Sequence, residues 1–327
     1  MSSVVFAGGK QEKGLGAGGG TGTEEEREDA APLELSISAL KGPTGIGMVR
    51  LFEKKPDLGA KVSAEYQIAG APDVIVSRIL SEEVDIATLP VNVAVKLYNK
   101  GVPYSLGAIV GNGLLYMLSS DPDVKGIDSV RGTEIYNVGK GATPDFVLRY
   151  LLDARGIGGE KGATVRFTYP HPELAQMLIA GRVKTAVLPE PFVTMVTMKN
   201  ENVLIVENLQ EVWSETVGTE ETYPMSVVVV KDDVWQKRPE VIEGFLKQYC
   251  ESITWVSTTP KAAGELAEKY GIGMPAAVAA QAIPRLNLTF VPADDAREEL
   301  ERFLNVFMDY DPSAIGGKLP DGDFYGE

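Results

Sequence analysis

Two short segments of the chain combine residues that can hold a small polar or anionic molecule. Lys41–Thr44 and Lys140–Thr143 both read lysine, glycine, any residue, threonine. Glycine lets a ligand approach the backbone closely, and a threonine hydroxyl can hydrogen-bond to that ligand. A helix that begins at such a turn adds free N–H groups and partial positive charge. The pattern therefore predicts two ligand-binding turns, each with a lysine able to supply charge to an anion.

The same residues also allow a purely structural interpretation. A threonine at the start of a helix commonly caps it, and a lysine in a loop is usually solvated. The sequence leaves capping and ligand contact open at Thr44 and Thr143. The pattern does not indicate nucleotide hydrolysis. A Walker A loop has a glycine upstream and a lysine that is directly followed by serine or threonine, and both features are absent here.

Two further polar residues stand where apolar segments end. Glu190 lies between Pro189 and Pro191, and these prolines restrict the direction in which the chain leaves the segment. Asn92 follows Pro90 after a comparable apolar segment. Both are predicted to face a ligand, Asn92 as a hydrogen-bonding residue.

His171 and Tyr223 complete the candidates. His171 opens an expected helix, where it either contacts ligand or caps the turn, and Tyr223 either stacks on a ligand or packs in the core. The predicted ligand-binding residues are Pro43, Thr44, Gly45, Pro90, Asn92, Asn112, Lys140, Gly141, Thr143, His171, Glu190 and Tyr223.

The near absence of cysteine and histidine restricts the chemistry. Cys250 and His171 are the only residues of their types. An intrachain disulfide and a zinc site built mainly from cysteine and histidine are therefore excluded, and a serine triad would need His171. We predict no catalytic residue, cofactor or metal site.

The two threonine turns belong to a longer internal repeat at an offset of 99 residues. Arg50 matches Arg149, and Leu89–Pro90 matches Leu188–Pro189. Each copy reads strand, turn, helix, strand, helix, strand, helix, a pattern typical of a parallel α/β sheet with right-handed crossovers. The expected strands are 35–39, 64–68 and 84–89 in the first copy, and 135–138, 164–169 and 183–188 in the second.

The repeat predicts two lobes that face each other across a cleft, where ligands sit beyond the carboxyl ends of the strands. Apolar strands at 104–109 and 114–118 lead out of the first copy, and another at 225–230 follows the second copy. Two crossing strands are expected to form a hinge between the lobes. Residues 32–119 and 225–327 form the first predicted lobe, with helices up to 295–308 returning to it. Residues 120–224 form the second.

Residues 1–31 are predicted to be a flexible tether or signal remnant. Residues 14–22 are nearly all glycine, alanine and threonine, and such composition cannot bury apolar area. Val4–Lys10 resembles the end of a signal sequence. Because of this signal-like segment, we expect an extracytoplasmic protein. No cysteine lies near the segment, so the sequence as given does not support a lipid anchor.

The overall charge restricts the partners. The 327 residues carry a formal net charge of −15, and residues 24–29 alone hold five acids and one base. Nucleic acid and anionic membrane surfaces attract basic proteins and are therefore not expected partners. No apolar run nears the roughly 20 residues that span a bilayer. We expect a monomer.

Several stretches resemble one known family. They are residues 39–48, 84–92, 139–144, 188–192 and 316–325. Through them the chain, from about Leu33 to its end, resembles ABC-transporter substrate-binding proteins of the nitrate/sulfonate/taurine type. This group also includes binders of thiamine-pyrimidine precursors.

The resemblance implies a two-lobe type II periplasmic-binding-protein fold with two crossover strands and a ligand cleft between the lobes. It implies capture of a small solute by hinge closure and delivery to an ABC permease and its ATPase. The family's ligand loops correspond to those at Thr44, Asn92, Thr143 and Glu190. Two alternatives stay open: an enzyme on the same fold, similar to a thiamine-pyrimidine synthase or a menaquinone-pathway dehydratase, and a solute-sensing receptor domain.

Overall fold

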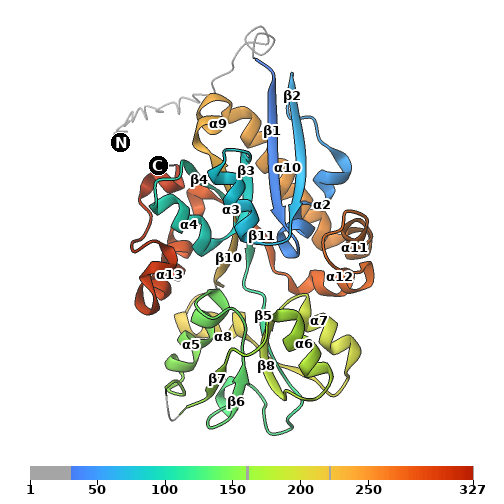
Figure 1. Cartoon of the computed structure of the whole chain (residues 1–327), viewed down its shortest axis with the longest axis vertical. Coiled ribbons are helices and arrows are strands. Elements are labelled where there is room, and N and C mark those ends of the chain that lie inside the picture. The colour runs from blue at the N-terminus through green and yellow to red at the C-terminus, as the bar shows by residue number, and fades with distance from the viewer. Residues whose placement is uncertain (1–30, 160–161, 221, 327) are drawn as a thin grey trace, which may run out of the picture.

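The computed structural model describes residues 31–159, 162–220 and 222–326, which form two α/β lobes, drawn one above the other in Figure 1. The predicted tether lies outside the described residues except for Ala31. A six-stranded sheet, in the order β11-β4-β10-β3-β1-β2, forms the upper lobe. Its strands are β1 (Leu33–Leu40), β2 (Val62–Ala69), β3 (Ile86–Pro90), β4 (Tyr104–Asn112), β10 (Pro224–Lys231) and β11 (Leu288–Pro292).

The lower lobe holds a five-stranded sheet in the order β7-β6-β8-β5-β9. The lobes share one pairing pattern. In the upper sheet β1 runs parallel to β2 and β3, and β10 pairs antiparallel with β3. In the lower sheet β6 runs parallel to β7 and β8, and β5 pairs antiparallel with β8. The lower strands are β5 (Leu115–Ser119), β6 (Glu134–Tyr136), β7 (Thr164–Arg166), β8 (Thr185–Pro189) and β9 (Leu204–Asn208).

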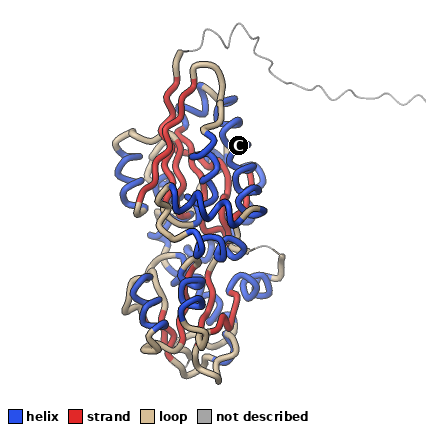
Figure 2. The backbone as a smooth tube through the Cα atoms, turned by 90° about the vertical axis from the view of Figure 1, so that its right-hand side faces the viewer, coloured by secondary structure: helices blue, strands red, loops and turns tan. Residues whose placement is uncertain are grey.

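The strands that repeat at an offset of 99 residues take matching places, β2-β1-β3 in the upper sheet and β7-β6-β8 in the lower one. β10 and β5, which lie outside the repeat, pair antiparallel with β3 and β8. The predicted α/β fold with two lobes and crossing strands is confirmed. Figure 2, turned by 90°, shows the strands of the two sheets as separate groups, with helices between them.

The lobe boundary requires a correction. The sequence placed residues up to 119 in the first lobe, but β5 pairs with β8 and β9 in the lower sheet. The chain instead crosses at Gly113 and Leu114, between β4 and β5. Both strands are apolar and fully or largely buried, so composition carries no sign of the change of sheet. A Cβ atom at Gly113 would lie 2.4 Å from the Tyr223 ring on the returning segment, so the crossing requires glycine there.

Helices cover both sheets. The upper lobe carries α2 (Pro43–Lys54), α3 (Pro72–Leu80), α4 (Val91–Asn99), α9 (Asp232–Lys237), α10 (Pro239–Thr258), α11 (Pro260–Lys269), α12 (Ala276–Ala282) and α13 (Ala293–Tyr310), and the lower lobe α5 (Thr143–Ala154), α6 (His171–Ile179), α7 (Phe192–Lys199) and α8 (Leu209–Val217). Short 3-10 helices are η1 (Ile127–Ser129), η2 (Ile283–Arg285), η3 (Pro312–Ile315) and η4 (Gly322–Tyr325). No helix in the described ranges is both long and apolar enough to cross a membrane.

The last long helix joins the two hydrophobic cores. α13 was expected to return to the first lobe, and it packs on β4, β10 and β11 there, but it also packs on α5 of the lower lobe. Phe307 meets Phe146 of α5 edge to face, with ring centroids 4.9 Å apart. Phe303 similarly meets Trp213 of α8. One buried cluster therefore runs from the upper sheet into the lower lobe.

Candidate functional site

A cavity of about 680 Å³ lies between the lobes. Turns that follow strands of both sheets line it, at the carboxyl ends where parallel sheets place ligands. Helices begin at most of these turns. The upper lobe contributes the starts of α2, α3 and α4, and the lower lobe the starts of α5, α6 and α7.

The upper wall presents main-chain donors beside polar side chains. No side chain among the described residues caps the first turn of α2, α3 or α4, whose N-cap residues are Gly42, Ala71 and Pro90. The first N–H groups of a helix have no partner within it, so here they can serve a solute or water. Asp73 and Asn92 line the cavity at the starts of α3 and α4.

The lower wall follows the same plan with different side chains. Among the described residues no side chain caps α5 or α6, whereas the Glu190 carboxylate accepts the Thr194 N–H in the first turn of α7. Thr143, His171 and Phe192, the first residues of these helices, all line the cavity. The rings of His171 and Phe192 lie 5.7 Å apart. Burial lowers the pKa of His171 because charging a desolvated imidazole is unfavourable, so the ring is neutral at pH 7.

The structure brings half of the predicted residues to this cavity. The residues in its lining are Pro43, Pro90, Asn92, Thr143, His171 and Glu190. The predicted residues outside its lining are Thr44, Gly45, Asn112, Lys140, Gly141 and Tyr223.

Thr44 and Gly45 serve the packing of α2 on β1. The Thr44 hydroxyl donates to the Leu40 carbonyl at 3.2 Å, so it neither caps the helix nor faces the cavity. A Cβ atom at Gly45 would lie 2.7 Å from that same carbonyl oxygen. Lys41, three residues before Thr44, lines the cavity instead. It is the lysine that the sequence pattern predicts could supply charge to an anion.

Lys140 and Gly141 lie at the exposed tip of the lower turn. The Gly141 N–H donates to Asp145 Oδ2 at 2.8 Å, and Arg149 Nε approaches the same carboxylate at 2.6 Å. Asp145 is buried and holds the turn in place from within α5. The backbone of Lys140 is thereby fixed while its side chain stays outside the cavity lining.

Asn112 and Tyr223 belong to the crossing between the lobes. Asn112 ends β4, and its N–H donates to the Asn287 carbonyl at 3.0 Å. Tyr223 is fully buried, and its hydroxyl donates to Gln210 Oε1 at 2.6 Å. The core-packing interpretation of Tyr223 is the one this geometry shows.

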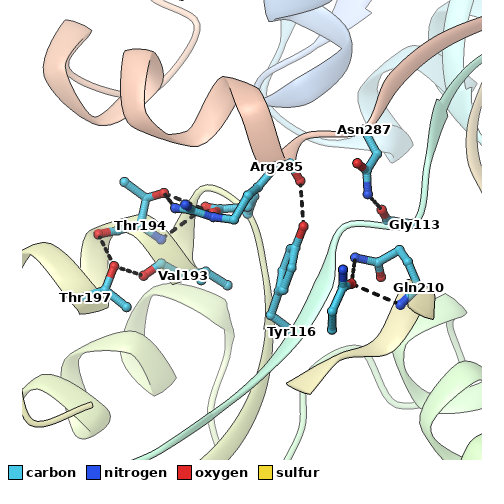
Figure 3. Close-up of polar contacts among 10 residues, drawn as sticks. Gly113, Tyr116, Val193, Thr194, Thr197, Gln210, Arg285 and Asn287 are labelled. Atoms are coloured by element: carbon cyan, nitrogen blue, oxygen red, sulfur yellow. Dashed lines mark hydrogen bonds and ion pairs between the residues drawn. The ribbon is translucent and has the colours of Figure 1, made fainter. Parts of the chain in front are cut away.

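Glu190 has a partner that sequence reasoning missed. Arg285 Nε lies 2.5 Å from Glu190 Oε1, and Thr194 donates to the same carboxylate through its N–H and its hydroxyl (Figure 3). The Glu190 side chain is wholly buried, so its slight exposure comes from the main chain. Arg285 stands 95 positions away at the end of η2, and no local pattern links the two.

The cavity therefore has a nearly balanced charge. Among the described lining residues, the charged side chains are Lys41, Asp73 and Glu190, and Arg285 neutralises the last. Apolar side chains such as Phe192 and Met274 share the lining. In the described part of the chain, no group of three or more histidine, cysteine or acidic residues could hold a metal ion.

The model of the NMT1-like family matches residues 51–270. The chain belongs to the NMT1-like family. The match covers the lower sheet, β2, β3, β4 and β10 of the upper sheet, and most of the residues that line the cavity. It confirms the resemblance drawn from the sequence. Among curated proteins no relative matches.

Solved structures agree in fold. An ABC transporter from Parabacteroides distasonis is 26% identical, with a TM-score of 0.78 and coverage of 89% of this chain and 97% of that one. The periplasmic aliphatic sulphonate binding protein SsuA from Escherichia coli is 15% identical, with a TM-score of 0.69 and coverage of 89% and 95%. The periplasmic nitrate-binding protein NrtA from Synechocystis PCC 6803 is 11% identical, with a TM-score of 0.65 and coverage of 90% and 84%.

Proposed function

We propose that this chain is the extracytoplasmic solute-binding component of an ABC-type importer. The observation that carries the proposal is the cavity itself, which equivalent turns of two lobes enclose with helix starts on both walls. Closure of such lobes surrounds a solute with hydrogen-bond donors and excludes water. A permease with its ATPase would then take the solute from the closed form, whose population the solute raises. We expect the protein to act as a monomer.

The lining favours an organic solute with a polar part and an apolar or heteroaromatic part. A volume of about 680 Å³ lies within the range of roughly 300–1,000 Å³ typical of sites for drug-sized ligands. Phe192, His171 and Met274 provide apolar and ring surface, whereas Asn92 and Thr143 provide hydrogen bonds. A polar heterocycle or a zwitterion suits this balanced lining better than a bare inorganic anion.

Binding without catalysis is the second part of the proposal. The sulphonate- and nitrate-binding proteins of similar fold are named for the solutes they bind. His171 lines the cavity as a neutral ring, and among the described residues no hydrogen bond or ion pair joins that ring to a nucleophile or an acid. An enzyme on this fold would consume the solute, whereas a binding protein would release it unchanged.

Native mass spectrometry of the purified protein tests the proposal. We expect a bound small molecule that is released intact on unfolding and that rebinds with one-to-one stoichiometry. Asn92→Ala and Thr143→Ala should weaken rebinding, whereas Lys140→Ala, next to the same turn but outside the lining, should not. Release of a chemically altered product, or equal loss in the Lys140 variant, would contradict the proposal.

A further inference from the structure

A short segment of the upper lobe reaches across to the lower lobe. This segment, Ile283–Asn287, joins α12 to β11 and is called the clasp below. α12 packs on α7 of the lower lobe. Figure 3 shows the clasp above the lower strands, with Arg285 pointing sideways toward Thr194 and Asn287 pointing down toward Gly113.

Arg285 is held by the lower lobe at both ends. Its guanidinium Nε lies 2.5 Å from Glu190 Oε1, and its Nη2 donates to Thr194 Oγ1 at 2.6 Å. Its main-chain carbonyl accepts a hydrogen bond from the Tyr116 hydroxyl at 3.3 Å. Asn287 Nδ2 also donates to the Gly113 carbonyl at the crossing point. The clasp thus contacts three separate elements that belong to or lead into the lower lobe.

Because Glu190 is buried, its ion pair with Arg285 affects how the two lobes are arranged. Its side chain has no exposed surface, while that of Arg285 is 34% exposed. An ion pair in such surroundings is stronger than one in water, and a buried charge that loses its partner is strongly disfavoured. If the lobes separated, Thr194 would remain beside Glu190, but the compensating positive charge would leave with the upper lobe.

The same chain segments form the cavity and lead into the clasp. Glu190 and Phe192 border the lower wall, and Thr194 lies within the same helix start. On the upper side, Ile272–Met274 line the cavity directly before α12. Separation of the two walls would therefore move the elements that Arg285 connects.

We propose that Arg285 holds the two lobes together before any solute binds, by pairing with Glu190 and Thr194. Solute entry then requires that this pair be broken, and closure forms it again. Only the statement about solute entry rests on the proposed function, because the contact of Arg285 with Glu190 and Thr194 exists without any solute. Glu190 accordingly acts as a positioning residue and not as a direct solute contact.

Interlobe distances in the solute-free protein test the tie. Spin labels can be placed on two exposed positions, Ser77→Cys in α3 and Lys199→Cys in α7, in a Cys250→Ser background. We expect the wild-type distribution to centre on the distance in this structure. Arg285→Gln should reduce that population at least fivefold in favour of longer distances.

Arg155→Gln is the matched control. Arg155 is 26% exposed and pairs with Asp128 and Glu215, all within the lower lobe, so its loss should leave the distances unchanged. Glu190→Gln should lengthen them, and the double variant Arg285→Gln with Glu190→Gln should shift them less than the sum of the two. Arg285→Lys, which keeps the charge and loses the fork of donors, should give an intermediate shift and serves if Arg285→Gln does not fold.

The proposal is overturned if the wild-type protein lacks the interlobe distance seen in this structure. It is also overturned if folded Arg285→Gln or Arg285→Lys retains the wild-type distribution of distances. Neither result would bear on whether a solute binds, which native mass spectrometry decides separately. Conversely, a chain that binds no solute but shows the expected shift would retain the tie and lose the proposed function.

Discussion

Lys41–Thr44 and Lys140–Thr143 occupy equivalent positions in the two lobes, yet they present different residues to the cavity. The upper turn contributes Lys41 and Pro43, while Thr44 turns inward to the Leu40 carbonyl. The lower turn contributes Ala142 and Thr143, while Lys140 remains outside the lining. The repeat therefore sets the path of the backbone, and packing within each lobe decides which side chain faces a solute.

The positions two residues after the threonines show the cause of this difference. Ile46 of α2 is fully buried in an apolar cluster with α10, α11 and α12. Its equivalent, Asp145 of α5, is also buried, but it accepts the Gly141 N–H and pairs with Arg149. The upper turn is thus held by apolar packing and the lower turn by a buried carboxylate.

Substituting these two equivalent positions should give the largest difference between the lobes. Ile46→Ala should lower the free energy of unfolding by about 2–5 kcal/mol, because it leaves a cavity in a packed core. Asp145→Ala should cost only about 1–3 kcal/mol, since Arg149 is 42% exposed and can be solvated. Urea unfolding of both variants measures this, and an Asp145→Ala cost equal to that of Ile46→Ala would contradict the comparison.

A smaller effect tests the close approach of α2 to β1. Gly45→Ala should destabilise the protein by about 1–3 kcal/mol, because the added Cβ atom would meet the Leu40 carbonyl oxygen at 2.7 Å. Gly47→Ala in the same helix is the control, since its nearest neighbour would be a side-chain atom at 3.4 Å. Thermal unfolding should show a loss for the first variant and none for the second, and equal losses would remove the argument that Gly45 is a packing residue.

The two threonines should differ in solute binding. Thr143→Ala should weaken affinity about 2- to 13-fold, the range expected for one hydrogen bond of roughly 0.5–1.5 kcal/mol. Thr44→Ala should leave affinity unchanged, because its hydroxyl bonds to Leu40 and lies outside the cavity lining. Calorimetric titration with the solute released from the native protein measures both, and a loss of affinity confined to Thr44→Ala would reverse the assignment.

The smallest expected effect concerns pH. His171 has Pro72 as its equivalent in the upper lobe, so only the lower wall titrates at this position. Because burial lowers the folded-state pKa of His171 below its ordinary 6.5, the unfolded chain binds more protons below pH 6.5. Stability should therefore fall as the pH drops below that value, and less so in His171→Gln. Melting temperatures between pH 7.5 and 5 check this, and identical slopes for the two proteins would contradict it.

The sequence was sufficient to predict the order of the repeated elements, because strands such as 35–39 and 84–89 are short, carry apolar residues at alternate or neighbouring positions, and end at glycine or proline turns. It missed β9 and β11, whose residues are at most partly buried and so lack a clear apolar pattern. It also missed Arg285, because a contact across 95 positions depends on how the two lobes come together. Half of the predicted residues line the cavity, because the sequence indicates where the turns lie but the side-chain directions within them depend on packing.

The central claim is that both lobes bind one solute in the cavity between them. Hydrogen–deuterium exchange with and without the solute released from the native protein tests this most directly. We predict slower exchange at the starts of α2 and α4 in the upper lobe and of α5 and α7 in the lower lobe, at one solute per chain. Protection confined to one lobe, or spread over surfaces away from these helix starts, would contradict the account.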